Sequence, residues 1–308
     1  ITATHNPPQP SITLREGVAP FSILIGGAGA TGVELEAELA YQFRNIPKEQ
    51  WSVTLVEALR NVLWMFPLGV SQYAHTRLEE FGVKLMLDTC IKSVEFYPSP
   101  PPSPTQRTRA ELGAGQAQGE GDQRLDGVEV VLAPRPLREG EQEKDLVCDF
   151  LPEHEKRMQP DMLIWAGGVR ANPLLAECGM AVDRKGRLEV DEHLQEKGME
   201  HVFAIGDNAL LVDPQTKQPV SATAQAALLE GKIVASNIVS AVQGVPLAMY
   251  PFTQFSTVVP LADHDAVALI GNRVIRGFPA WVLRKAADCR YFASIVGWRK
   301  AVRLCLFR

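Results

Sequence analysis

The first regular pattern along the chain is an apolar strand followed by a glycine turn and a helix. Phe21–Ile25 is a short, partly β-branched apolar run, which is typical of a buried parallel strand. The apolar positions that follow recur at near-helical spacing: Val33, Leu35, Leu39 and Phe43. A second apolar run at 51–57 completes a predicted strand–helix–strand unit.

The pattern then repeats. Residues 70–83 predict a helix that Gly82 closes, and short strands are expected near 83–86 and 91–96. Alternation of strands and helices in this order predicts an α/β fold with a doubly wound, Rossmann-like parallel sheet.

Residues 98–125 interrupt this alternation with a stretch rich in Pro, Gly, Gln and Ser, which predicts a low-complexity insertion. Its GAGQAQG is not a nucleotide-binding loop, because its last glycine comes one position too late and no apolar strand precedes it. The apolar runs 127–134 and 145–150 are expected to form a hairpin, and 161–168 a further buried strand.

The second half predicts short strands around "RLEVDEHLQ" and "HVFAIGDNALL", and then a helix from about Thr223 to Val242. Two strand-like segments follow at 255–261 and 265–271, and the segment from Arg273 is basic, aromatic and amphipathic. We therefore expect a linker (1–20), a nucleotide-binding domain (21–165), a second domain (166–245), and a C-terminal region of strands and an amphipathic tail (246–308).

Composition narrows the possible functions. The 308 residues carry a formal net charge of −5, which argues against a nucleic-acid partner. The five cysteines are odd in number and form no CxxC pair, so we expect no disulfide framework and no metal site. The sequence contains no uninterrupted run of 18 apolar residues, so we expect no transmembrane helix.

The glycine turn is the main candidate for chemistry. Gly27, Gly29 and Gly32 form GxGxxG between a strand and a helix, where they permit a tight turn, close approach of a pyrophosphate, and close helix packing, respectively. The helix N-terminus would then bind the phosphates. Glu57 ends the second strand and is expected to accept hydrogen bonds from a ribose, which favours NAD(H); Arg60 nearby weakens that preference. The alternative is that Glu57 is a solvated residue at the end of a strand.

Three further stretches, 161–175, 187–211 and 219–238, lie in the same order and spacing as in a known family. Together with the glycine turn, they closely resemble flavin-dependent pyridine-nucleotide oxidoreductases, and among them the type II NADH dehydrogenases, which are NADH:quinone oxidoreductases. The resemblance covers roughly residues 21–97 and 160–308. It implies that 21–165 is the NADH-binding domain and that 166–245 is the C-terminal part of an FAD-binding domain. It implies two cofactors, FAD and NAD(H), with a quinone as electron acceptor.

The resemblance also implies roles for particular residues in the second half. Gly206 and Asp207 match a motif whose aspartate contacts the flavin ribitol, and Thr223, Ala224 and Gln225 match residues beside the isoalloxazine ring and the quinone. Gly167 is expected among the cofactor-binding residues. From the residues alone, the alternative is that Asp207 is the N-cap of a helix that "NALL" begins.

Glu34 follows the glycine turn, and the resemblance places it near the nicotinamide and flavin as a proton source for the quinone. With Gln225, it is the predicted catalytic residue. The alternative is a first-turn glutamate that the helix dipole favours.

The sequence departs from the family in three ways. The first FAD glycine motif should precede residue 21 and is missing, so we expect the chain to be part of a longer protein. Leu229 and Glu230 stand where the family often has glutamine, which would lose or alter a quinone contact. The insertion at 98–125 is the third difference. The cysteines exclude close relatives, because they lack the local settings that disulfide reductases and sulfide:quinone oxidoreductases need. A silent NAD(H)-binding module and a flavin reductase with a soluble acceptor remain as alternatives.

The segment 273–308 combines basic residues with aromatic ones, which predicts a helix lying in a membrane interface. Leu283, Ala287, Tyr291 and Ile295 form one helical stripe. The resemblance places the enzyme as a peripheral protein on the cytoplasmic face of the inner (plasma) membrane. The alternative is a helix pair that packs on the body of the protein or on the second subunit of a homodimer.

Overall fold

The computed structural model describes residues 20–97, 127–139, 141, 146, 155–253 and 255–306. The chain divides into two compact units, and each is described by itself. The first unit comprises the described residues of 1–167, 258–267 and 276–308, and the second comprises those of 168–257 and 268–275. The predicted linker and the predicted insertion at 98–125 fall outside the described residues.

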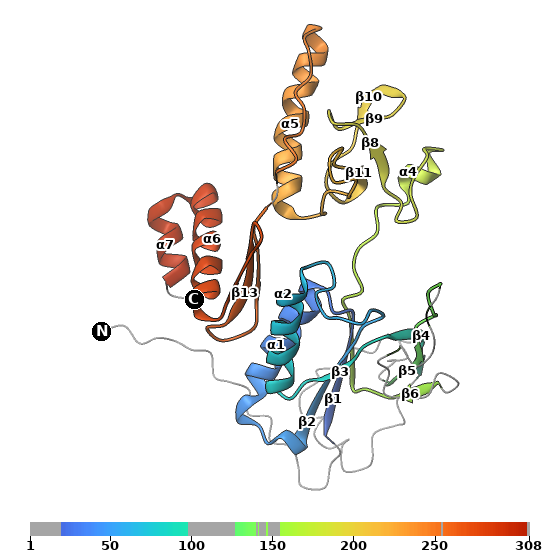
Figure 1. Ribbon diagram of the computed structural model, residues 1–308, viewed down its shortest axis with the longest axis vertical. Coiled ribbons are helices and arrows are strands. Elements are labelled where there is room, and N and C mark those ends of the chain that lie inside the picture. Colours follow the sequence, from blue (N-terminus) through green and yellow to red (C-terminus); the bar gives the residue numbers. More distant parts are fainter. Residues whose placement is uncertain are drawn as a thin grey trace, which may run out of the picture. The chain divides into compact units, whose positions relative to one another are not determined.

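A four-stranded parallel sheet forms the centre of the first unit (Figure 1). Its strands, in the order β3-β2-β1-β7, are Lys84–Met86, Trp51–Val56, Phe21–Gly26 and Met162–Trp165. Helix α1 (Ala30–Gln42), the short 3₁₀ turns η1 (Phe43–Asn45) and η2 (Lys48–Gln50), and helix α2 (Leu68–Glu80) provide the crossovers. This confirms the predicted α/β fold with a Rossmann-like strand order.

Burial within this sheet follows strand position. Ile25 and Leu55 in the central strands are completely buried, as the apolar runs predicted. Strand β7 is different, because Met162 is 45% and Trp165 64% exposed. The strand predicted at 161–168 is therefore present, but its predicted burial was wrong, since β7 lies at the edge of the sheet and is covered less completely than an inner strand.

A second, antiparallel sheet packs beside the first. It contains β4 (Thr89–Tyr97), β5 (Gly127–Pro134) and β6 (Lys156–Met158) in that order. The strand predicted at 91–96 therefore belongs to this sheet and not to the parallel one. The predicted hairpin partner, 145–150, lies almost wholly outside the described residues, and β5 pairs with β4 and β6. Leu24, Met86 and Leu132 belong to one buried cluster that joins the two sheets.

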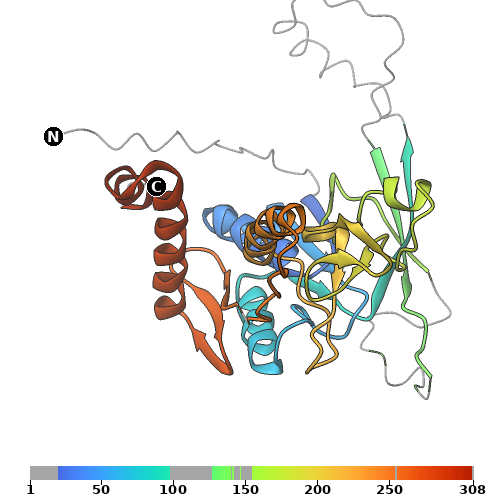
Figure 2. The ribbon, with the colours of Figure 1, turned by 90° about the horizontal axis from the view of Figure 1, so that it is seen from above.

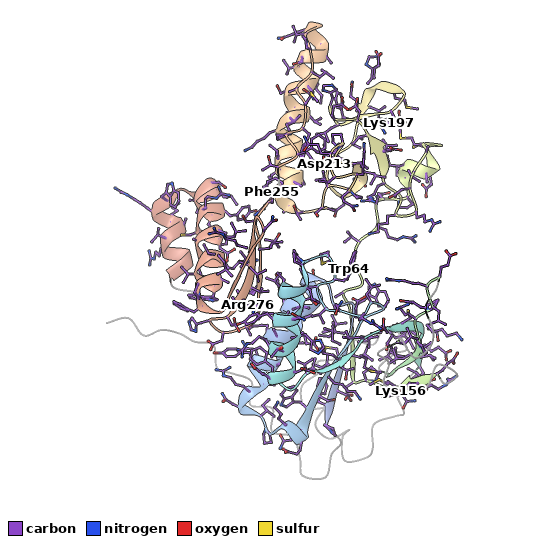
Figure 3. The ribbon with its side chains drawn as sticks, viewed as in Figure 1. Trp64, Lys156, Lys197, Asp213, Phe255 and Arg276 are labelled. Carbon is purple, nitrogen blue, oxygen red and sulfur yellow. The ribbon has the colours of Figure 1, made fainter. Side chains whose placement is uncertain are left out.

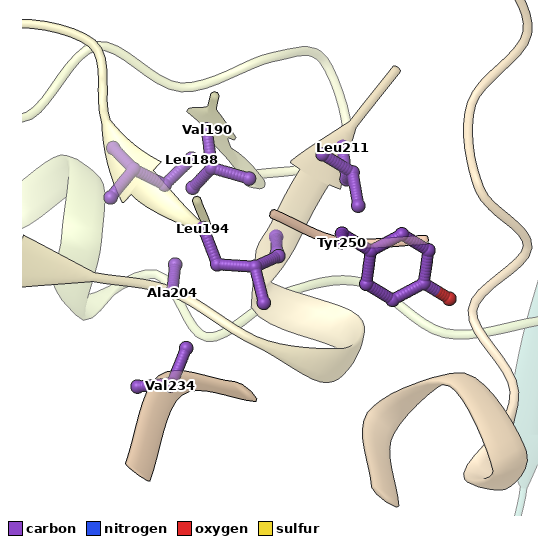
Figure 4. Close-up of a cluster of buried hydrophobic side chains, with 8 residues drawn as sticks. Leu188, Val190, Leu194, Ala204, Leu211, Val234 and Tyr250 are labelled. Atoms are coloured by element: carbon purple, nitrogen blue, oxygen red, sulfur yellow. The ribbon is translucent and has the colours of Figure 1, made fainter. Parts of the chain in front are cut away.

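The second unit contains a smaller sheet and one long helix. The sheet has the order β10-β9-β8-β11, with strands Met199–Phe203, Gln195–Glu196, Leu188–Val190 and Ala209–Leu211. Its helical elements are α4 (Leu174–Glu177), η4 (Gly206–Asn208) and α5 (Ala224–Gln243). Leu188, Leu194, Leu211 and Tyr250 pack with Val234 of α5 into one apolar core (Figure 4).

The end of the chain folds into three strands and two helices. The strands are β12 (Thr257–Pro260), β13 (Ala266–Ile270) and β14 (Arg273–Arg276), in that order. The amphipathic tail predicted from Arg273 therefore begins with a strand, and its helices are α6 (Phe278–Val296) and α7 (Trp298–Leu306). Helices α6 and α7 lie side by side in Figure 1, and Figure 2 shows the same pair of helices from above. Within the described residues, no helix has the length and apolar character needed to cross a bilayer.

Candidate functional site

The glycine turn joins the carboxyl end of β1 to the start of α1. Gly27 has a φ of +106°, and a Cβ there would lie 2.6 Å from the carbonyl oxygen of Ala166. Its N–H donates to the carbonyl of Val56 at 2.8 Å. The turn lies where the chain order of the sheet reverses, between β1 and β7, and α/β sheets bind ligands at such a point.

The other two glycines meet different demands. A Cβ on Gly32 would lie 1.9 Å from the carbonyl oxygen of Gly27, so this position requires glycine for helix packing. A Cβ on Gly29 would meet only Cε of Met65, at an ordinary 3.8 Å. Gly29 is also the N-cap of α1, and no side chain caps that helix. The turn therefore leaves open space and uncapped N–H groups at one place, which is the geometry that holds a phosphate.

Glu57 is built into this turn. Its side chain is buried, and Oε2 accepts the N–H of Ala28 at 2.7 Å while Oε1 accepts the N–H of Leu59 at 3.0 Å. The interpretation as a solvated strand-end residue was therefore wrong. A carboxylate has further lone pairs after two such bonds, so it retains acceptors for a ribose.

The loop after β2 adds apolar side chains that the sequence analysis missed. Its backbone is tied to the glycine turn, since the N–H of Leu63 donates to the carbonyl of Ala28 at 2.8 Å. Trp64 and Met65 are 52% and 49% exposed, and Trp64 is labelled in Figure 3. The signal was present in the run "NVLWMFP", a cluster of large apolar residues in a predicted loop. The structure buries Val62 and Leu63 of this run completely and leaves Trp64 and Met65 exposed.

Gly167 follows β7 at the same edge of the sheet. A Cβ on this residue would lie 2.8 Å from Cε2 of Trp165, so the indole ring occupies the space that a side chain would need. The N–H of Ala166 donates to the carbonyl of Gly26 at 2.8 Å, which ties the end of β7 to the end of β1. The structure thus brings Gly167 into the neighbourhood of the glycine turn within the first unit.

Glu34 lies in the second turn of α1, which has no acidic residue in its first turn. The first-turn interpretation was therefore wrong. Burial raises the pKa of the Glu34 carboxyl, the cation of Arg284 on α6 opposes this rise, and Asp288 adds to it. Nη1 of Arg284 lies 4.0 Å from Oε1 of Glu34, and its Nε lies 3.1 Å from Asp288.

The second unit presents Asp207 on a tight turn. Gly206 has a φ of +61° and begins η4, and residues Ala209–Leu211 after it form strand β11. The alternative that Asp207 caps a helix begun by "NALL" is therefore wrong. Its side chain is exposed at the end of an apolar segment.

Glu230 supports this turn from α5. It is 4% exposed, and Oε2 accepts the N–H of Gly206 at 2.6 Å. Burial raises the pKa of the Glu230 carboxyl, the Gly206 N–H lowers it, and Asp207 raises it. The sequence analysis considered this position only for a lost quinone contact, whereas its carboxylate is committed to the backbone of the Gly206–Asp207 turn.

Helix α5 begins as predicted. Thr223 is its N-cap, and the hydroxyl oxygen accepts the N–H of Ala226 at 3.2 Å. Ala224 and Gln225 form its first turn and are exposed. The N-terminal end of a twenty-residue helix is thus open at these residues, with its positive dipole end toward solvent.

Comparison with known proteins identifies relatives of this chain. The sequence profile of the pyridine nucleotide-disulphide oxidoreductase family matches residues 12–99 and 116–231. The type II NADH:quinone oxidoreductases of Staphylococcus saprophyticus and Staphylococcus haemolyticus are 25% and 26% identical to the chain over 283 residues. These alignments cover 90% of this chain and 58% of each relative, so the chain spans little more than half of their length.

Solved structures show the same fold. NDH2 from Plasmodium falciparum, in complex with NADH, superposes with a TM-score of 0.65 at 14% identity, covering 93% of this chain and 64% of the other. The NAD-dependent persulfide reductase from A. fulgidus gives a TM-score of 0.51 at 17% identity, covering 80% and 35%.

Proposed function

Because the chain belongs to the pyridine nucleotide-disulphide oxidoreductase family, we propose that it contributes the NADH-binding domain and part of the FAD-binding domain to an NADH:quinone oxidoreductase. The observation that carries the proposal is the glycine turn of the first unit with Glu57 bonded into it. The names of the Staphylococcus relatives support the reaction, and their greater length supports a contribution to a larger enzyme.

NADH binding follows from the turn. Gly29 leaves room for the pyrophosphate, the uncapped N–H groups of α1 donate to it, and the Glu57 carboxylate accepts from the adenosine ribose. A carboxylate at this point repels a 2′-phosphate, which favours NADH over NADPH. Met65 provides an apolar surface beside the turn.

Flavin binding is proposed for the second unit. The exposed Asp207 would accept hydrogen bonds from the ribitol hydroxyls, and the start of α5 at Thr223–Gln225 would direct its dipole at the isoalloxazine ring. A bound flavin supplies the chemistry that accepts hydride from NADH and passes two electrons to a quinone. The role of the chain is to hold and orient the reactants.

Glu34 is proposed to hold the proton that quinone reduction consumes. Burial favours its neutral form, and Arg284 limits how far its pKa rises. Gln225, exposed in the first turn of α5, is proposed as a quinone contact.

The α6–α7 segment is proposed to bind a membrane surface, where quinone is dissolved. Tyr291, Ile295 and Trp298 are 55%, 62% and 64% exposed, and basic side chains accompany them. The protein would then be a peripheral one, and the resemblance to the type II NADH dehydrogenases favours the cytoplasmic face of the membrane.

The test is the visible absorption spectrum of the purified chain before and after anaerobic addition of NADH, together with an NADH titration. A flavin spectrum that bleaches would support the proposal in full. A colourless chain that binds NADH would favour the NAD(H)-binding module, which the partial coverage of the relatives also fits. Replacement of Glu57 by Ala should weaken NADH binding about tenfold through the loss of charge-assisted hydrogen bonds. A chain that binds neither cofactor would refute the proposal.

A further inference from the structure

A buried aspartate supports the loop that carries Glu57. Asp88 lies between β3 and β4, its side chain is completely buried, and its φ is +49°, a left-handed conformation that residues other than glycine adopt rarely. The N–H of Asp88 donates to the carbonyl of Leu59 at 3.2 Å, and the N–H of Leu59 donates to Oε1 of Glu57 at 3.0 Å. A single residue, Leu59, therefore links Asp88 to the carboxylate proposed for the ribose.

The backbone of Glu57 is held by the same segment. The N–H of Glu57 donates to the carbonyl of Met86, and the N–H of Thr89 donates to the carbonyl of Glu57, both at 2.9 Å. Asp88 lies between Met86 and Thr89 in the chain, so its conformation decides where these two partners lie. The position of Glu57 therefore depends on how firmly Asp88 is held.

Arg135 holds Asp88 through both its backbone and its side chain. It follows β5 of the antiparallel sheet, and its side chain is 7% exposed. The N–H of Arg135 donates to the carbonyl of Asp88 at 2.8 Å, and its Nε donates to Oδ1 of Asp88 at 2.7 Å. These two hydrogen bonds restrain the left-handed backbone and the carboxylate of Asp88 at once.

The opposite edge of the Arg135 guanidinium is also held. Nη1 and Nη2 donate to the two carboxylate oxygens of Glu141 at 2.6 and 2.9 Å, and Nη1 also donates to the carbonyl of Pro136 at 3.1 Å. A forked pair of this kind fixes the plane of the guanidinium. The Nε edge of Arg135 therefore stays directed at Asp88.

Resting on the proposed NADH site, we propose that Arg135 is a positioning residue for nucleotide recognition, which acts through Asp88 to hold the Glu57 carboxylate against the adenosine ribose. The side chain of Arg135 bonds to Asp88, Glu141 and Pro136, so its effect on the nucleotide is indirect. The pyrophosphate would bind at Gly29 and the N-terminal end of α1. Loss of Arg135 should therefore reduce recognition of the ribose rather than of the phosphates.

The test compares the dissociation constants of ADP and 2′-deoxy-ADP for the full chain and its variants, because these ligands differ only in the ribose 2′-hydroxyl. Wild type should bind ADP about tenfold more tightly, as expected for one hydrogen bond to a carboxylate. Arg135→Met should reduce this ratio to about two and leave the affinity for 2′-deoxy-ADP within about threefold. A merely structural role would weaken both ligands equally and leave the ratio unchanged.

Two further variants test the connection from Arg135 to Glu57. The double variant Asp88→Asn with Arg135→Met removes both members of the buried ion pair, and asparagine tolerates a left-handed φ. It should show the same reduced ratio, and it decides the question if Arg135→Met alone does not fold. In Glu57→Ala the two ligands should bind equally, and adding Arg135→Met should change the ratio no further.

The matched control is Arg157→Met on the neighbouring strand β6. Arg157 pairs with Glu129 and its side chain is 62% exposed, so this variant removes an equal charge from the same sheet and should keep the wild-type ratio. A second readout needs no nucleotide. The amide resonance of Leu59, whose N–H donates to Glu57, should shift in Arg135→Met and stay in place in Arg157→Met.

The outcomes separate the two proposals. If wild type preferred ADP and the Arg135 variants kept the same ratio, the positioning role would be overturned and the NADH site would stand. Equal binding of the two ligands by wild type would overturn the ribose role of Glu57, and that of Arg135 with it. If wild type bound neither ligand, the NADH site itself would be refuted together with the positioning role.

Discussion

Two glycines of the turn, Gly32 and Gly29, have different roles. Gly32 is required by packing, because the carbonyl oxygen of Gly27 occupies the position of a Cβ, whereas Gly29 has room for one. A structural glycine and a ligand-contact glycine can therefore be told apart by experiment.

Gly32→Ala is expected to destabilise the chain by about 3 kcal/mol through overpacking at the start of α1. Gly29 has a φ of −69°, which alanine also adopts. Gly29→Ala should therefore change the free energy of unfolding by no more than about 0.5 kcal/mol. It should nevertheless weaken NADH binding at least about tenfold, because its methyl group fills the space left for the pyrophosphate. Chemical denaturation and NADH titration of both variants measure this. Equal stability of the two variants would contradict the assignment.

Glu34 gives a second prediction at this scale. Arg284→Met should raise the pKa of Glu34 further, because it removes the cation that opposes the rise, and Asp288→Asn should lower it. Carbon-13 NMR titration of the Glu34 carboxyl measures both shifts. Shifts of the same sign in the two variants would be incompatible with the arrangement on α6.

At the scale of an element, α1 carries an unusual residue on its buried face. Glu36 is 0% exposed, and neither of its carboxylate oxygens has a hydrogen-bond partner among the described residues. Burial therefore raises the pKa of Glu36 well above its ordinary value. Burial thus favours the neutral form of the Glu36 carboxyl in the folded helix.

The folded state binds the Glu36 proton more tightly than the unfolded state does, so stability should fall as pH rises above about 4.5. Stability stops falling once the pH exceeds the raised pKa of Glu36 in the folded state. Glu36→Leu should remove this pH dependence and stabilise the chain by about 2 kcal/mol at pH 8. Denaturation midpoints of the wild type and of Glu36→Leu from pH 4 to 8 measure this pH dependence. The control is Glu38→Leu, which changes an exposed glutamate of the same helix. A pH profile unchanged in Glu36→Leu would contradict the prediction.

The whole molecule combines an acidic composition with a basic C-terminal end. Helix α7 exposes Arg299, Lys300 and Arg303, with Trp298 and Val302 on the same short helix. Charge and apolar surface are therefore concentrated in one segment of a chain whose net charge is −5.

Replacing Arg299, Lys300 and Arg303 by Gln should weaken binding to anionic phospholipid vesicles about a hundredfold, since each basic residue near the surface contributes about 1 kcal/mol. Sedimentation with vesicles of one-third phosphatidylserine measures it. The matched control is Arg170, Arg184 and Lys185 to Gln, which removes the same charge from exposed residues of the second unit. Equal loss in the control would show a general charge effect.

Local patterns determined much of this protein. The strand, glycine turn and helix at 21–42, the second strand, and the start of α5 at Thr223 lie where the sequence predicted them, because apolar periodicity and turn chemistry act between near neighbours. The places of Gly27, Gly32 and Glu57 at the glycine turn could be predicted for the same reason.

Only the tertiary structure decided the rest, because it depends on which distant segments meet. The strand at 91–96 joined an antiparallel sheet, and β7 lay at an exposed edge, since pairing partners are not encoded in periodicity. The bond from Gly206 to Glu230, the approach of Arg284 to Glu34 and the pairing of Arg60 with Asp88 join residues 24 or more positions apart. The sequence by itself determined the elements and the turn, and tertiary packing determined which charges face each other around them.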